Sequence, residues 1–148
     1  MHKHVKVIGI GSPFGQDRAG IEVVERLSSG QSWASLPLSL AFVVLDRPGP
    51  ALIPLLADAD LVVLTDALAP GSSMQEIQRI NLEELALNDA RPSSHSFGVA
   101  ETLALARAMG MLPPELWIYP LPAMPVASLA LSLEQQLGQD LRLWCGVA

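Results

Sequence analysis

The stretch VKVIGIGSPFGQDRAGIEVVERL, from Val5 to Leu27, constrains the fold more than any other part of the chain. It opens with a short apolar run, Val5 to Ile10, of the kind found in strands that are buried on both faces. Glycines and a proline then interrupt the run, and from Arg18 onward apolar residues recur at helical spacing. This change predicts the opening strand-turn-helix unit of an α/β protein. Asp17 falls at the junction, where it is a candidate N-cap of the helix.

The rest of the chain continues this alternation. Strands are predicted over Leu38–Leu45, Asp60–Thr65, Met74–Ile80 and Leu116–Leu121, and helices over Ala51–Ala57, Glu83–Leu87, Phe97–Met109 and Val126–Leu137. The order predicts an α/β three-layer sandwich, in which a mostly parallel twisted sheet carries helices on both faces. Met74–Ile80 follows the preceding strand without a helix between them, so it is predicted to be one antiparallel edge strand. In the helix predicted over Phe97–Met109, the side chains expected to face inward are Val99, Leu103, Leu105 and Ala106.

Length and composition set the broad class. The 148 residues fit a single domain, 1–148, with a core of its own. Half of the residues are hydrophobic and 16% are charged, as expected when both faces of a sheet are covered. The net charge is −6, with 9 basic residues against 15 acidic ones. Because phosphate binding needs concentrated Lys and Arg, this balance argues against a nucleic-acid partner.

Cysteine content and the N-terminus bear on the compartment. Cys145 is the single cysteine, so an intramolecular disulfide is excluded and an oxidising compartment is not indicated. The basic residues near the start precede an apolar run that is too short for a signal peptide. A membrane span would need about 18 uninterrupted apolar residues, and the chain contains none. We therefore expect a cytoplasmic protein without a membrane span.

Three chemically capable side chains follow predicted strands or precede predicted helices: Asp17, Asp66 and His95. Parallel strands place their carboxyl ends at one edge of a sheet, where ligands bind in such folds. Two carboxylates and one imidazole could hold a divalent metal and leave coordination positions open. The residues alone leave other roles open, because Asp17 could be only a helix cap, Asp66 could close a turn, and His95 could be exposed.

The sequence resembles the hydrogenase maturation proteases, which trim the C-terminal extension from the large subunit of nickel-iron hydrogenases. The similar pieces are VIGIGSPFGQDRAG, DLVVLTDALAPGSSMQEIQRI and SSHSFGVAETLALARAMGMLPPELWIYPL, and they occur in the family's order. The resemblance implies that Asp17, Asp66 and His95 are the metal ligands and the catalytic residues. It also implies a metal-dependent endopeptidase of the hydrolase class that acts on a hydrogenase large-subunit precursor after nickel insertion.

The same resemblance implies the cofactor. The expected ion is a divalent metal, nickel, shared with the substrate, because a three-ligand site can take further ligands from the precursor or from water. The sequence leaves the oligomeric state open, with a monomer as the working expectation.

Two alternatives remain at this stage. Gln16 stands where the family more often has a second adjacent acid, and this motivates a non-cleaving relative that binds a partner and senses nickel loading. The glycines of the first turn could instead bind a dinucleotide, with Asp46 on the ribose. That fingerprint requires a glycine at position 14, which is Phe14, and an acid about 20 residues further on.

The turn at Arg47 and Pro48 also differs from the family's Gly- and Thr-rich turn, which predicts a different choice of substrate.

Overall fold

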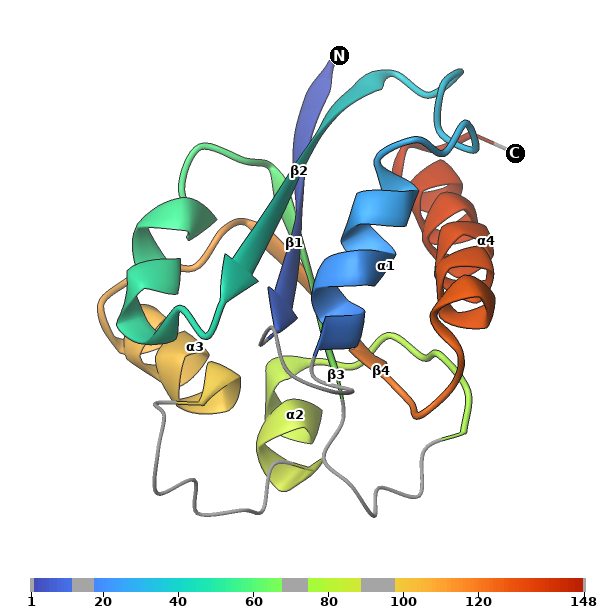
Figure 1. Ribbon diagram of the computed structural model, residues 1–148. Coiled ribbons are helices and arrows are strands. Elements are labelled where there is room, and N and C mark those ends of the chain that lie inside the picture. Colours follow the sequence, from blue (N-terminus) through green and yellow to red (C-terminus); the bar gives the residue numbers. More distant parts are fainter. Residues whose placement is uncertain (1, 12–17, 68–74, 89–97, 148) are drawn as a thin grey trace.

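The computed structural model describes residues 2–11, 18–67, 75–88 and 98–147, and Figure 1 shows how its elements are arranged. In chain order the elements are the strand β1 (Lys3–Gly11), the helix α1 (Ala19–Leu27), β2 (Leu38–Asp46), the 3₁₀ helix η2 (Gly49–Leu56), β3 (Leu61–Ala67), α2 (Leu82–Asn88), α3 (Val99–Ala108), β4 (Glu115–Leu121) and α4 (Val126–Trp144).

The strands form one four-stranded sheet with the order β2-β1-β3-β4. Every pairing between neighbouring strands is parallel, with Val7 of β1 opposite Val63 of β3 in the middle of the sheet. β4 lies at an edge and contains Pro120. A residue without a backbone N–H is tolerated there because the outer side of an edge strand needs no ladder partner. The α/β class and the parallel sheet predicted from the sequence are confirmed.

The predicted antiparallel edge strand Met74–Ile80 is wrong. Met74 lies outside the described residues, residues 75–79 have no regular secondary structure, and Ile80 alone forms an antiparallel bridge with Ile118 of β4. The Ile80 N–H donates to the Ile118 carbonyl at 2.8 Å. Pro120, two residues further along β4, has no N–H with which to continue the ladder. The segment therefore meets the edge of the sheet at one residue and does not extend it.

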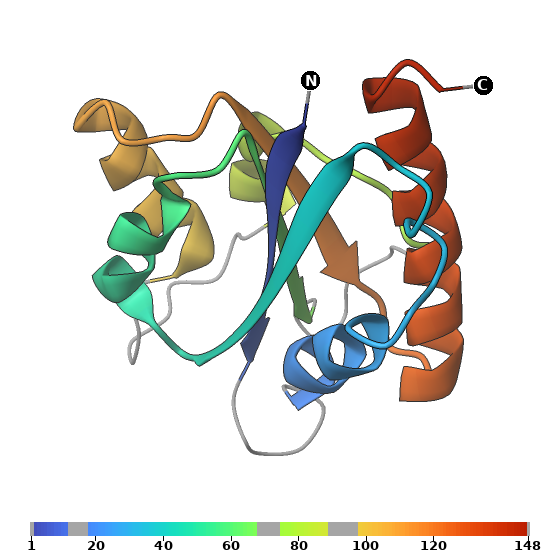
Figure 2. The ribbon, with the colours of Figure 1, turned by 90° about the horizontal axis from the view of Figure 1, so that it is seen from above.

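Helices cover both faces of the sheet (Figure 2). α1 and α4 pack on one face, and η2 and α3 pack on the other. Along β1, Val5 and Val7 belong to the first buried cluster, whereas Ile8 and Ile10 belong to the second. Successive side chains of a strand point to opposite faces, so burial on both faces requires the continuous apolar run seen in the sequence.

α1 packs directly on the backbone of β1 at two glycines. A Cβ atom on Gly9 would lie 2.3 Å from the Gly20 carbonyl oxygen, and one on Gly20 would lie 2.1 Å from the Ile10 carbonyl oxygen. Both contacts would be steric overlaps, so this approach requires residues without a side chain. The first turn of α1 is thereby held against the carboxyl end of β1.

α1 begins one residue later than the predicted cap implies. Arg18 occupies the N-cap position and makes no side-chain capping hydrogen bond. Its Nε instead donates to Oε1 of Glu22 at 2.7 Å, one turn into the helix. This ion pair accounts for a positive charge at a helix N-terminus, where the helix dipole alone would disfavour it. Asp17 itself lies outside the described residues.

Two other helices differ from expectation. The segment predicted as a helix over Ala51–Ala57 is the 3₁₀ helix η2, because Pro54 lacks the N–H of an α-helical hydrogen bond and its ring crowds the preceding turn. In α3, Leu103 and Ala106 are buried as predicted and Val99 is partly buried, but Leu105 is 38% exposed. Phe97, the predicted first residue of that helix, lies outside the described residues.

α4 runs from Val126 to Trp144 without a break, whereas the sequence predicted a helix to Leu137 with a possible continuation through Leu143. Leucines at every fourth position face the first buried cluster, and they are Leu129, Leu133, Leu137 and Leu141. In the described part of the chain, no helix combines the length and the apolar character that crossing a bilayer requires.

Candidate functional site

The structure describes one of the three predicted site residues. Asp66 is the sixth residue of β3, and its side chain is partly buried. In the sheet register it lies between Ile10 of β1 and Pro120 of β4. Asp17 and His95 lie outside the described residues, so the distances between these three side chains stay a prediction.

A rigid strand positions Asp66. The five residues before it, Leu61 to Thr65, are each at most 1% exposed, and β3 is paired with a strand on both sides. Successive side chains of a strand alternate between its two faces. Asp66 therefore lies on the same face as Val62 and Leu64, which belong to the cluster beneath η2 and α3. The backbone that carries this carboxylate is therefore held from both sides and from both faces.

Asp66 also lies at the point where the strand order reverses. From β1 the chain passes through α1 to β2 on one side of the sheet, and from β3 it passes through α2 and α3 to β4 on the other side. We call the strand ends Gly11, Asp46, Ala67 and Leu121 the carboxyl edge. In open parallel sheets ligands bind at this edge, outside the two strands whose connections diverge. Here those two strands are β1 and β3.

Two helices begin near the carboxyl edge, and each begins shortly after a predicted ligand in the sequence. Asp17 precedes Arg18, the N-cap of α1, and His95 comes shortly before Gly98, the N-cap of α3. The first turns of both helices lie at the end of the molecule toward which the strands point, the lower end in Figure 1. The described residues that follow these two sequence positions, Arg18 and Gly98, therefore lie toward the end of the molecule that holds Asp66.

The end of β2 adds a charged pair to the carboxyl edge. The Arg47 N–H donates to the Gly11 carbonyl at 2.9 Å, which ties this turn to the end of β1. Arg47 Nε also donates to Oδ1 of Asp46 at 3.0 Å. Arg47 has a φ of 42°, a conformation that favours glycine.

Sequence reasoning missed Thr65, which precedes Asp66 and is fully buried. It lies opposite Gly9 in the register of β1 and β3, on the face covered by α1. Its hydroxyl oxygen has no hydrogen-bond partner among the residues that the structure describes. An unsatisfied buried hydroxyl costs about 1–3 kcal/mol. A threonine in a strand carries no sequence signal for such a position, because threonine is an ordinary strand residue.

Across residues 2–11, 18–67, 75–88 and 98–147, no three His, Cys, Asp or Glu side chains form a group that could hold a metal. A metal centre built from three such side chains would therefore have to include residues outside the described ranges, as the predicted ligands Asp17 and His95 are. A partly buried carboxylate on a rigid strand is a suitable oxygen ligand, and an imidazole completes a donor set that suits divalent transition metals.

Comparison with known proteins shows similarity in structure only. No family model and no curated protein sequence matches the chain. An endopeptidase from Escherichia coli, solved in solution, superposes with a TM-score of 0.74 at 22% identity, covering 97% of this chain and 94% of that one.

Two further structures are named for hydrogenase maturation. The hydrogenase-maturating endopeptidase HybD from E. coli gives a TM-score of 0.64 at 19% identity, with 95% and 91% of the two chains covered. The [NiFe] hydrogenase maturation protease HycI from Thermococcus kodakarensis gives 0.61 at 18% identity, with 95% and 93% covered. At these identities the comparison shows a shared fold. The fold that the sequence resemblance implies is therefore confirmed.

Proposed function

We infer that the chain belongs to the hydrogenase maturation proteases, and we propose that it removes the C-terminal extension of a nickel-iron hydrogenase large-subunit precursor after nickel insertion. The observation that supports this most directly is the place of Asp66. It lies at the switch point of a sheet whose fold is shared, over nearly the whole chain, with several hydrogenase maturation endopeptidases. The sequence resemblance selects the same residue independently.

In this proposal Asp17, Asp66 and His95 hold a divalent metal, the nickel that the precursor carries. When bound, such an ion polarises a carbonyl group or activates a water molecule. The chain's own contribution is to fix the ligands in place, and the buried strand before Asp66 does this for one of them. A carboxylate at this position could also accept a proton during hydrolysis. We place the reaction in the cytoplasm, since the one cysteine gives no sign of an oxidising compartment.

Metal binding provides the first test. We would titrate nickel or cadmium into the protein by calorimetry at neutral pH, beside Asp17→Ala, Asp66→Ala and His95→Ala. Loss of a ligand should weaken binding by roughly tenfold or more. Glu115→Ala is the matched control, because this exposed carboxylate lies at the amino end of β4, opposite to the carboxyl edge. Equal affinity in all variants would contradict the three-ligand site.

Turnover provides the second test. Mass spectrometry of a nickel-loaded precursor incubated with the protein should show loss of the C-terminal peptide, and Asp66→Ala should abolish that loss. An unchanged mass would contradict proteolysis. If the protein still bound the precursor and the metal, the non-cleaving relative suggested by Gln16 would replace the protease as the proposal.

A further inference from the structure

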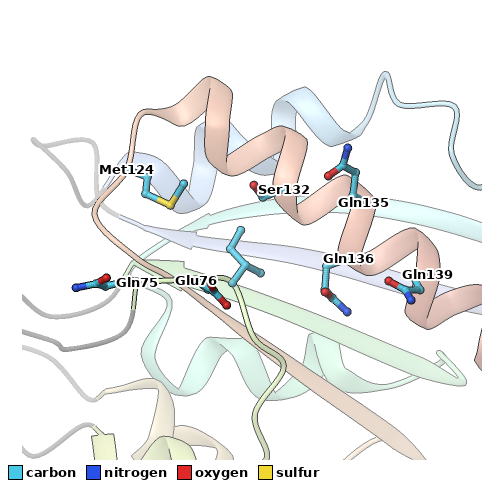
Figure 3. Close-up of a pocket in the computed structure, with 8 residues that line it drawn as sticks. Gln75, Glu76, Met124, Ser132, Gln135, Gln136 and Gln139 are labelled. Carbon is cyan, nitrogen blue, oxygen red and sulfur yellow. The ribbon is translucent and has the colours of Figure 1, made fainter.

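A cavity of about 360 Å³ lies beside α4, and Asp66 is not one of its lining residues. Figure 3 shows side chains from α4 on one side and from the segment that follows residue 74 on the other. We call it the glutamine groove, and its lining residues are Gln75, Glu76, Ile77, Met124, Ser132, Gln135, Gln136 and Gln139.

The lining of the glutamine groove is mostly polar and includes two apolar side chains. Ser132, Gln135 and Gln139 follow one another at intervals of three and four residues, so they form a stripe along one face of α4. Ile77 and Met124 are partly buried and pack against the buried cluster beneath α4. The stripe therefore offers hydroxyl and amide groups next to a small apolar surface, and such groups can form hydrogen bonds with a polar ligand.

A further lining glutamine, Gln136, is held by a hydrogen bond within α4. Gln136 Nε2 donates to Oδ1 of Asp140 at 3.2 Å, and the Tyr119 hydroxyl donates to the other oxygen of the same carboxylate at 2.5 Å. Tyr119 is fully buried in β4. The Gln136 amide is therefore oriented before any ligand arrives, which lowers the entropy lost on binding.

The lining favours a polypeptide as the ligand. Each glutamine amide offers two donors and one acceptor, which match the C=O and N–H groups of a peptide backbone. Among the described residues that line the groove, Glu76 is the one charged side chain, so this part of the lining has neither the cations that an anion needs nor the carboxylates that a metal needs. From Ser132 to Gln139 the helix rises roughly 10 Å, the length of about three residues of extended chain.

The glutamine groove begins near the carboxyl edge. Met124 follows the end of β4 at Leu121, and Gln75 is where the described chain resumes after β3. Figure 3 shows Met124 at the start of α4 and Gln139 further along the helix. A peptide whose scissile bond lies at the carboxyl edge can therefore continue along α4 in this groove.

We propose that the glutamine groove is an exosite that binds an extended segment of the precursor next to the scissile bond. The proposal rests on the proposed function and adds a second binding surface to it. Affinity for the precursor would then depend on residues that take no part in the chemistry.

Steady-state kinetics on the nickel-loaded precursor test this. The double variant Gln135→Ala/Gln139→Ala removes two exposed amides and leaves Gln136 and its bond to Asp140 intact. We expect KM to rise roughly tenfold, the effect of losing two hydrogen bonds, with kcat unchanged. Gln31→Ala, an exposed glutamine in the loop between α1 and β2, is the matched control and should leave both constants unchanged. An unchanged KM in the double variant, with cleavage intact, would overturn the exosite and leave the protease proposal standing.

Nuclear magnetic resonance on the unmodified chain gives a readout that needs neither turnover nor a variant. A synthetic peptide with the sequence around the precursor's cleavage point should shift the side-chain amide resonances of Gln135, Gln136 and Gln139, and should leave that of Gln31 in place. Shifts in the groove without cleavage of the precursor would support the exosite and contradict proteolysis. Binding elsewhere, or no binding at all, would overturn the exosite even if cleavage were observed.

Discussion

Tyr119 allows a quantitative test of the interior beneath the glutamine groove. It is the one tyrosine in the chain, it is fully buried, and its hydroxyl donates to Asp140. Burial, reinforced by the hydrogen bond to Asp140 and by the charge of that carboxylate, raises the pKa of Tyr119 far above the usual 10.0. Deprotonation in the folded protein is therefore suppressed.

This raised pKa makes stability depend on alkaline pH. The folded state keeps its proton where the unfolded state has lost it, so the stabilisation is fully present below pH 10 and falls as the pH rises further. One proton changes the free energy of unfolding by about 1.4 kcal/mol per pH unit. Because no other tyrosine contributes, the rise in absorbance near 295 nm that accompanies tyrosinate formation comes from Tyr119, above the constant absorption of the three tryptophans. We expect no tyrosinate signal until circular dichroism shows unfolding.

Tyr119→Phe removes the hydroxyl and keeps the ring. A hydrogen bond to a charged group contributes about 1.5–3 kcal/mol. We expect a loss near the lower value, because Asp140 keeps its bond from Gln136 and is only partly buried. For a chain of this size that loss lowers Tm by roughly 3–6 °C. The variant should also show a weaker fall in stability above pH 10 than the unmodified protein. A tyrosinate signal that rises near pH 10 while the protein stays folded would refute this reasoning.

Three glycine substitutions test the packing of the helices by chemical denaturation. Gly9→Ala places a Cβ atom 2.3 Å from the Gly20 carbonyl oxygen and should cost about 3 kcal/mol; unchanged stability would contradict the close approach of α1 to β1. In Gly138→Ala, inside α4, the new Cβ lies 3.4 Å from the Ser32 Cβ, and the higher helix propensity of alanine should raise the free energy of unfolding by about 0.5–1 kcal/mol. A lower free energy of unfolding would show that the space around Gly138 is tighter than described. Gly110→Ala, at a φ of 69° with no atom within 4 Å of the new Cβ, should cost about 1 kcal/mol from backbone strain alone; no change would argue against a left-handed residue after α3.

The sequence by itself determined the α/β class and the position of Asp66. A strand buried on both faces must be apolar at every position, and the runs in β1 and β3 can be identified without knowledge of their neighbours. The resemblance to hydrogenase maturation proteases then selected Asp66 together with Asp17 and His95 as site residues, which stays a prediction, and the structure describes Asp66 as the last residue but one of a central strand.

Only the tertiary structure decided features that depend on partners distant in sequence. Ile77 and Ile80 suggest a strand, but whether a ladder forms depends on the outer edge of β4, where Pro120 has no N–H to donate. Leu105 has the spacing of a core residue, yet its exposure is set by the elements that pack around α3. The polar stripe of α4 reads as a solvent-facing surface, because helical periodicity describes one helix at a time. It becomes one wall of a groove only because residues 75–77 lie across from it in the folded chain.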